Sequence, residues 1–281
     1  MTIGAPNYIW RKRIGPRWME RQEARLQQFT GGSHAVIEQA GRKRVLLECF
    51  CETSERAQKL VAEFGGKLEK VPRNWQAQLL AAQPTKPLRI GKRLLIVSQP
   101  QPASAHGTTT PALIIPAGAA FGTGDHATTA MSLRLLEKVT RRLPAGWRMF
   151  DAGTGSGVLA LAARRFRASG VLAVDNDPLA ISTAKENARQ NGIRGIEFAL
   201  ADVTSVKLRR FDLITANLYS ELLAQMLPRF RRSLRVGGLL ICSGLLRQQE
   251  GALLRGLRRN GLALFEARRR GKWVALVCSP K

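Results

Sequence analysis

A glycine-rich turn followed at a fixed distance by an aspartate is the part of this sequence best suited to chemistry. Residues 150–157 read Phe-Asp-Ala-Gly-Thr-Gly-Ser-Gly, and an apolar run that starts at position 171 ends at Asp175, eighteen residues after Gly157. The glycines allow a tight turn and let a ligand approach the backbone. An acid at the tip of the next strand can accept hydrogen bonds from both hydroxyls of a ribose. The spacing therefore predicts a nucleotide-binding β-α-β unit.

The position of the third glycine distinguishes between two classes of cofactor. A dinucleotide fingerprint, Gly-x-Gly-x-x-Gly, would need a glycine at position 158, which is Val158. The third glycine is instead Gly157, and Gly-x-Gly-x-Gly is typical of methyltransferases that use S-adenosyl-L-methionine (SAM). SAM carries no pyrophosphate, so it needs close backbone approach but no phosphate cradle. We expect SAM as the cofactor, with a glycine-rich turn that holds no ligand as the alternative.

The net charge of +25 is the unusual feature of the composition. Residues 1–110 carry 18 basic and 8 acidic side chains, and residues 111–281 carry 27 and 12, so the excess is spread over both parts. Such a field favours polyanions and predicts nonspecific, salt-dependent affinity for RNA. Arginine outnumbers lysine 33 to 12, so the excess could also follow from coding-sequence composition. The basic clusters are not interleaved with aromatic residues, which argues against a platform that stacks single-stranded bases.

Cysteine and histidine usage argues against a metal site. The four cysteines contain no Cys-x-x-Cys pair, and the chain has three histidines. Alternation along a strand places Cys49 and Cys51 on one face, where we expect small buried apolar side chains. No apolar run approaches the ~18 residues of a membrane helix, and the first residues lack a signal-peptide core. We therefore expect a cytoplasmic protein with no membrane partner.

The elements before the glycine turn predict a small α+β domain over 1–71 and a linker over 72–116. In the small domain we expect helices at 15–29 and 54–64 and strands at 34–39, 45–51 and 67–71. The first two of these strands are expected to form a hairpin around Gly41. Proline residues punctuate the linker, which is expected to contain one short hairpin within 88–97.

Strands and helices alternate regularly in the predicted third segment, 117–281. Helices are expected at 128–142, 158–166, 178–191, 220–232 and 246–259. Strands are expected at 148–152, 171–175, 196–200, 211–217, 239–243, 263–267 and 273–278. This order predicts a doubly wound, Rossmann-like parallel sheet with an antiparallel last strand. Ligands bind such sheets at the carboxyl ends of the strands, where Gly153, Asp175 and Asn217 fall.

Several blocks of the sequence resemble a known family. Residues 120–129, which read Ala-Phe-Gly-Thr-Gly-Asp-His-Ala-Thr-Thr, are similar to the loop before the catalytic domain of ribosomal protein L11 methyltransferases. The other similar blocks are 74–75 with 88–91, 151–160, 174–178, 186–188 with 191–192, and 211–218. The likeness is dense from 74 to about 244 and much weaker over 1–70, the region that recognises the protein substrate in that family.

The resemblance implies a SAM-dependent protein methyltransferase that modifies amine nitrogens, of lysine side chains or of the N-terminal α-amine, in a ribosomal protein of the L11 type. It implies that the backbone of the turn at Gly153 and Gly155 contacts SAM, that Asp175 binds the ribose and that Thr129 helps to close the pocket. It also places Asn217 beside the transferable methyl group, where it could orient the acceptor amine. The residues support this last role because a short amide at a strand tip offers both a donor and an acceptor, although a turn-forming asparagine is the alternative. No general base is evident.

Two further side chains near these blocks have open roles, and a third is given none. Asp202 could reach the adenine or could be a helix-cap or turn acid. Tyr219 could line the acceptor channel or merely pack. A lone histidine in a loop is more often structural, so His126 is given no catalytic role. Three other functions also stay open. They are a SAM-dependent RNA methyltransferase, which the charge favours, another protein-lysine methyltransferase of the same family, and a SAM-binding protein without catalysis.

Overall fold

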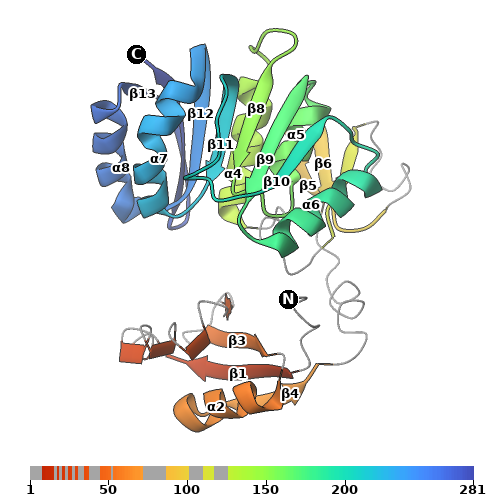
Figure 1. Ribbon diagram of the computed structural model, residues 1–281, viewed down its shortest axis with the longest axis vertical. Coiled ribbons are helices and arrows are strands. Elements are labelled where there is room, and N and C mark those ends of the chain that lie inside the picture. The colour runs from red at the N-terminus through yellow and green to blue at the C-terminus, as the bar shows by residue number, and fades with distance from the viewer. Residues whose placement is uncertain are drawn as a thin grey trace. The chain divides into compact units, whose positions relative to one another are not determined.

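The computed structural model divides the chain into two compact units, Met1–Gln78 and Leu79–Lys281 (Figure 1). The structure describes residues 8–15, 18, 21–22, 25–26, 29–30, 35–37, 45–51, 53–71, 87–100, 110–116 and 126–281. The predicted helix at 15–29 is described only in part, and the predicted turn at Gly41 and the motif residues 120–125 lie outside the described residues.

The first unit contains an antiparallel sheet of strand order β2-β3-β1-β4 and the helix α2. Its elements are β1 (Tyr8–Ile14), β2 (Ala35–Ile37), β3 (Val45–Cys51), α2 (Ser54–Phe64) and β4 (Lys67–Lys70). Helix α2 begins where the side chain of Thr53 accepts a hydrogen bond from the Arg56 backbone N–H, 3.3 Å away. Cys49 and Cys51 are both fully buried, as the alternation predicted.

The central strand β1 was not predicted, because its middle residues form the basic run Arg11-Lys12-Arg13. The neighbouring strands compensate this charge. The Arg11 Nε atom lies 2.7 Å from a carboxylate oxygen of Glu48 on β3, and the Arg11 guanidinium also pairs with Glu69 on β4. The Lys12 ammonium donates to the backbone oxygen of Phe64. Arg11 and Lys12 are therefore held by partners on the neighbouring strands and at the end of α2.

The second unit is built on a seven-stranded sheet of order β10-β9-β8-β11-β12-β14-β13. Its strands are β8 (Arg148–Ala152), β9 (Gly170–Asp175), β10 (Ile196–Leu200), β11 (Phe211–Asn217), β12 (Leu234–Leu246), β13 (Leu262–Arg270) and β14 (Trp273–Pro280). The first five strands in spatial order pair in parallel, and β14 is antiparallel to both of its neighbours. The predicted Rossmann-like sheet with an antiparallel last strand is confirmed.

Helices cover both faces of this sheet (Figure 1). They are α4 (Ala127–Val139), α5 (Val158–Arg165), α6 (Pro178–Gln190), α7 (Ser220–Ser233) and α8 (Arg247–Arg259). Successive strand residues enter different cores, since Met149 packs with α4 and α5 whereas Phe150 packs with α7 and α8. Burial on both faces explains why the sequence shows these strands as continuous apolar runs.

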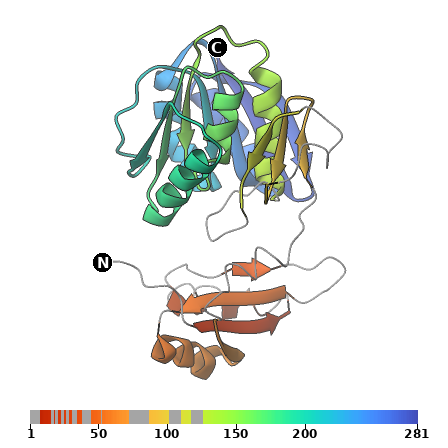
Figure 2. The ribbon, with the colours of Figure 1, turned by 90° about the vertical axis from the view of Figure 1, so that its right-hand side faces the viewer.

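A separate three-stranded sheet, β5-β6-β7, packs onto α4 (Figure 2). Strands β5 (Leu88–Ile90) and β6 (Leu94–Val97) form the predicted antiparallel hairpin, and β7 (Ala112–Ile114) pairs with β6 in parallel. Ile90, Leu94 and Leu113 are fully buried in the same core as α4 and α5. The division between the units falls after Gln78, so most of the predicted linker, 72–116, belongs to the second unit.

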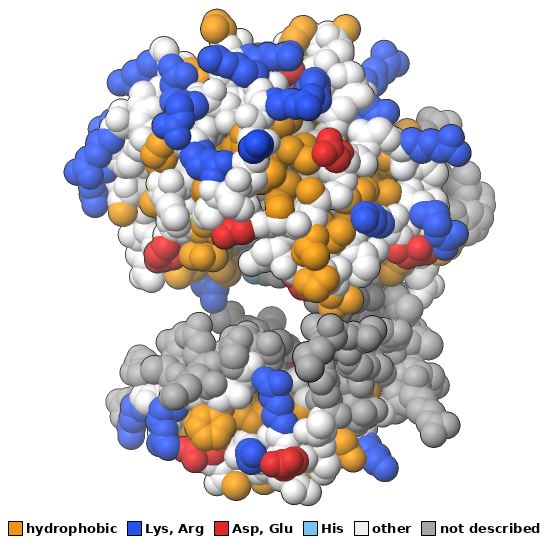
Figure 3. Space-filling model, in the orientation of Figure 1, with side chains coloured by type: hydrophobic (Ala, Val, Ile, Leu, Met, Phe, Trp, Pro, Cys, Tyr) orange, Lys and Arg blue, Asp and Glu red, His pale blue; other side chains and the backbone are white. Residues whose placement is uncertain are grey.

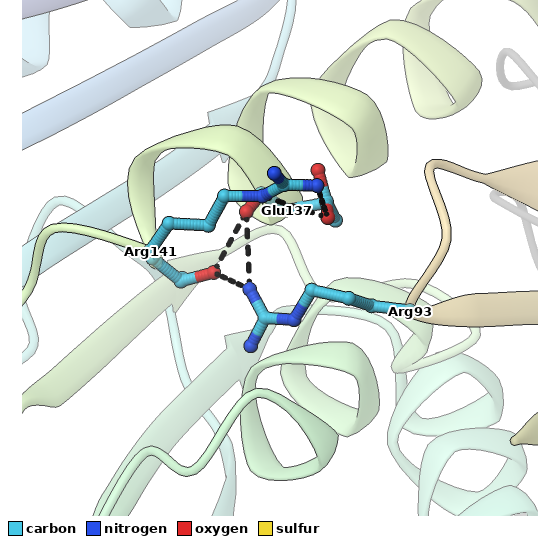
Figure 4. Close-up of polar contacts among 4 residues, drawn as sticks. Arg93, Glu137 and Arg141 are labelled. Carbon is cyan, nitrogen blue, oxygen red and sulfur yellow. Dashed lines mark hydrogen bonds and ion pairs between the residues drawn. The ribbon is translucent and has the colours of Figure 1, made fainter. Parts of the chain in front are cut away.

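The hairpin is fixed to the last turns of α4 by the residue set in Figure 4. One Nη atom of Arg93 donates to the backbone oxygen of Glu137 at 3.2 Å and to the hydroxyl of Thr140 at 3.1 Å. Arg141 pairs with the buried Glu137 carboxylate at 2.6 Å. The Arg93 guanidinium also lies 4.5 Å from the centre of the Phe166 ring, and burial lowers its pKa. These contacts hold α4, whose first turn carries Thr129, against the hairpin.

In the described residues no group of three or more His, Cys, Asp or Glu side chains is arranged to hold a metal ion. All four cysteines are free and buried. Burial raises the pKa of the Cys49 and Cys278 thiols to about 12, so they are protonated and unreactive at neutral pH. The described part of the chain contains no helix with the length and apolar character that crossing a membrane requires.

Candidate functional site

The carboxyl ends of β9, β8 and β11 lie side by side in the sheet, with β8 in the middle. Gly153 directly follows β8, whereas Asp175 and Asn217 are the last residues of β9 and β11. The topology thus brings together three of the residues that the sequence assigned to cofactor binding. We refer to this side of the sheet as the carboxyl edge.

The glycine turn uses backbone conformations that favour glycine. Gly153, Gly155 and Gly157 have φ values of 71°, 54° and 80°. A Cβ atom on Gly157 would lie 2.9 Å from the Cβ of Ala184, so this glycine lets α5 begin close to α6. The backbone N–H groups of Gly153 and Thr154 both donate to the Val174 oxygen, at 2.9 and 3.0 Å. The turn is therefore fastened to the end of β9.

The half-buried Asp175 carboxylate braces the same turn. One of its oxygens accepts from the Gly155 N–H at 2.9 Å, and the other accepts from the Asp177 N–H at 3.1 Å. Each carboxylate oxygen has two lone pairs, so both oxygens keep capacity for further donors such as ribose hydroxyls. Asp177 in turn caps α6 by accepting from the Leu179 N–H at 2.8 Å, with Pro178 in the first turn of the helix.

Asp151 is a site residue to which the sequence analysis gave no role. It is fully buried near the end of β8 and accepts hydrogen bonds from Thr215 on β11, at 2.6 Å, and from Thr154 in the turn, at 2.8 Å. Burial raises the pKa of Asp151 to about 6, the two threonine hydrogen bonds oppose this rise, and the negative charge of Asp175 adds to it. An acid inside an apolar strand, directly before a glycine turn, is the signal that could have identified it.

The side chain of Asn217, at the end of β11, approaches that of Thr129, which lies in α4. Thr129 is 1% exposed in the first turn of α4, and its hydroxyl oxygen lies 3.5 Å from the Asn217 Nδ2 atom. The Asn217 Oδ1 atom is buried and has no hydrogen-bond partner among the described residues. A buried acceptor without a donor costs about 1–3 kcal/mol. The arrangement therefore offers an acceptor for a donor that is not part of the chain, such as an ammonium or amine group.

The contacts and exposure of three nearby side chains, His126, Asp202 and Tyr219, indicate what each of them does. His126 caps α4, its Nδ1 atom lies 2.7 Å from the Thr128 hydroxyl, and its ring meets Trp273 edge-on at 4.9 Å. The exposed Asp202 accepts from the Thr204 N–H at 2.7 Å, a contact that lowers its pKa and that suits a turn acid. Tyr219 is 62% exposed just before α7, so it does not simply pack in the core.

Comparisons with known proteins point to one family. A family model described as ribosomal protein L11 methyltransferase matches residues 32–281. A ribosomal protein L11 methyltransferase of Pelotomaculum thermopropionicum is 40% identical over 197 residues, which cover 70% of this chain and 63% of that protein. The corresponding protein of Symbiobacterium thermophilum is 37% identical over 192 residues, which cover 68% of this chain and 62% of that protein. The matched part of the chain thus spans less than two thirds of these relatives.

A solved structure supports the same relationship. The crystal structure of a ribosomal protein L11 methylase from Lactobacillus delbrueckii subsp. bulgaricus is similar to this chain, with a TM-score of 0.62 and 30% sequence identity. The similarity covers 70% of this chain and 100% of that chain.

Proposed function

The chain belongs to the ribosomal protein L11 methyltransferase family, and from that premise we propose that it transfers methyl groups from SAM to amine nitrogens of ribosomal protein L11. The observation that carries the proposal is the buried, unpartnered Oδ1 atom of Asn217, which lies at the same edge of the sheet as the glycine turn and Asp175. An acceptor in this place suits both the amino group of SAM and an acceptor amine.

The residues at the carboxyl edge fit SAM. The backbone of the turn at Gly153 and Gly155 would approach its methionine part, Asp175 would accept from the ribose hydroxyls, and Thr129 with Asn217 would border the methyl group. Asp151 would add a buried negative charge behind the turn, which favours a cationic ligand. When bound, SAM supplies an electrophilic methyl group on a sulfonium.

The chain's contribution to the reaction is to position a neutral amine. Methyl transfer is a direct displacement, so holding the nitrogen in line supplies much of the catalysis. A free lysine with a pKa of ~10.4 is neutral only about once in 2,500 molecules at pH 7. Desolvation beside a sulfonium favours the neutral form. The Oδ1 atom of Asn217 could then accept one N–H of that amine and orient its lone pair. The acceptor could be a lysine side chain or the N-terminal α-amine.

We further propose that the first unit selects the protein substrate and that the reaction takes place in the cytoplasm, where ribosomal proteins are made. Support for the first point comes from the placement of the candidate cofactor residues, all of which lie in the second unit. The second unit also has its own hydrophobic cores. We therefore expect it to bind SAM without the first unit.

Labelled SAM tests the proposal directly. Incubation with purified L11 and, separately, with ribosomal RNA should place the label in the protein. Label in RNA would instead establish an RNA methyltransferase, and SAM binding without transfer to either would leave a SAM-binding protein. A truncated chain that starts at Leu79 is expected to bind SAM and to lose most L11 methylation. Full L11 methylation by that truncated chain would contradict the role of the first unit.

A further inference from the structure

The excess of positive charge is concentrated in one part of the second unit. Residues 204–281 carry 16 basic and 4 acidic side chains, whereas residues 126–203 carry 11 and 7. Of the four acids in 204–281, Asp212, Glu250 and Glu266 are already paired with arginines. The C-terminal segment therefore accounts for almost half of the charge of the whole chain.

The topology places six of these cations, together with five arginines of 126–203, at one edge of the sheet. Each helix of the second unit runs back to the side where the next strand begins, which we call the amino edge and which lies opposite the candidate site. In Figure 1 this edge carries the C-terminus. Arginines lie in the last turn of a helix or directly after it, and a further pair precedes β11: Arg141-Arg142, Arg164-Arg165, Arg189, Arg231-Arg232, Arg258-Arg259 and Arg209-Arg210.

Basic side chains lie at both edges, since Arg247 begins α8 and Arg270 ends β13 at the carboxyl edge, but the acids are distributed unevenly. The acids Asp151, Asp175, Asp177 and Asp202 lie at the carboxyl edge, whereas Lys and Arg side chains gather over the upper end of the second unit in Figure 3. Cations in the last turn of a helix stabilise its dipole, but this effect does not account for Arg209-Arg210, which are not in a helix. Arg209 and Arg210 therefore call for a further explanation.

Five of these arginines are available for a ligand. Arg209, Arg210, Arg232, Arg258 and Arg259 are exposed, and none of them makes an ion pair or side-chain hydrogen bond with a described residue. The segments that carry them are linked to α7, on which Arg232 itself lies. Its side chains donate to the backbone oxygens of Val206, shortly before Arg209, and of Gly261, in the turn after α8. We call these five residues the arginine cluster.

We propose that the arginine cluster binds the phosphate backbone of folded RNA, on the side of the sheet opposite the candidate site. Guanidinium groups are always charged and match the geometry of phosphate oxygens with paired N–H donors. The exposed aromatic residues of the described second unit lie elsewhere, since Tyr219 is at the carboxyl edge and Phe265 is on the outer strand β13. The cluster thus offers charge without stacking surfaces, which suits the backbone of structured RNA rather than its bases.

The test uses the full chain and a fluorescein-labelled RNA hairpin, with binding measured by anisotropy from 50 to 250 mM NaCl. The triple variant Arg209→Gln, Arg210→Gln and Arg259→Gln should bind about tenfold or more weakly at 100 mM salt. The slope of log affinity against log salt should fall by about 1 for each arginine that contacts a phosphate. The thermal midpoint of each variant shows that it is folded.

A matched triple variant removes the same charge elsewhere. Lys185→Gln, Arg247→Gln and Arg270→Gln change exposed side chains without an ion pair, in the middle of α6, at the start of α8 and at the end of β13. RNA affinity close to that of the wild type in this control supports the cluster. Equal losses in both variants, or no RNA binding by the wild type at 50 mM salt, would overturn the proposal. Competition by polyglutamate as effective as that by RNA would also overturn it, in favour of an acidic protein partner.

Discussion

Replacing Asn217 with leucine should stabilise the free protein and impair methyl transfer, a combination that a purely structural asparagine would not show. The buried Oδ1 atom without a partner costs about 1–3 kcal/mol, and leucine removes it with little change of shape. The contact that is lost, from Nδ2 to Thr129, is long at 3.5 Å and contributes little. We expect a net gain of about 1 kcal/mol, which raises the melting temperature of a unit of this size by about 2–4 °C.

Calorimetry without ligand measures the first effect, and the shift of the melting temperature on adding SAM measures binding. The single-turnover rate at saturating SAM isolates the chemical step, where we expect a loss of about 10²-fold, or about 2.7 kcal/mol of transition-state stabilisation. Ser132→Ala is a matched control, since the Ser132 hydroxyl on α4 is also buried without a partner. It should stabilise the protein and leave SAM binding unchanged. A lower melting temperature of Asn217→Leu together with a normal single-turnover rate would refute the reasoning.

Three other substitutions test separate parts of the site. Asp175→Ala should weaken SAM binding by about 10- to 100-fold, because a charged acceptor for the ribose hydroxyls contributes about 1.5–3 kcal/mol. Titration calorimetry that shows unchanged affinity in a folded variant would exclude that role. Since burial raises the pKa of Asp151 to about 6, the folded protein keeps a proton that the unfolded chain releases above about pH 4. The free energy of unfolding should therefore fall by about 3 kcal/mol from this group as the pH rises from about 4 to about 6. Urea titrations at several pH values should show that the free energy of unfolding of Asp151→Asn lacks this decrease. If the free energies of the wild type and of Asp151→Asn changed in parallel with pH, the raised pKa of Asp151 would be contradicted. Gly244→Ala should destabilise the protein more than Gly192→Ala in chemical denaturation, because both residues have positive φ but only the Cβ at 244 would overlap the backbone oxygen of Leu218. Similar losses of stability in both variants would show that the backbone around Leu218 shifts readily to make room for the added methyl group.

The sequence predicted the second unit well because its signals are local. Apolar runs marked the strands, Asp177-Pro178 marked the start of α6, and Gly192 marked its end. The strand β1 was missed because the partners of its arginine, Glu48 and Glu69, are distant in the sequence and leave no local pattern. The early start of β12 at Leu234 was missed because its two glycines suggest a turn.

The site could be predicted only in part. Spacing and side-chain chemistry identified the glycine turn and Asp175. The contact between Asp151 and Thr215 depends on β8 lying beside β11, an order of strands that no local pattern reveals. Thr129 entered the predicted site through family resemblance, because nothing in the residue spacing shows that the first turn of α4 reaches Asn217, 88 residues later.

The position of β14 has a consequence for how the protein is made. This strand lies between β12 and β13, and it follows both of them in the sequence. While the ribosome is still synthesising the chain, β12 therefore has an open edge and β13 has no partner in the sheet. The outer half of the sheet closes only after β14 has emerged, so this step comes late in folding and leaves unpaired strands at risk of aggregation until then. A stop codon between the end of β13 at Arg270 and Trp273 would make that state permanent.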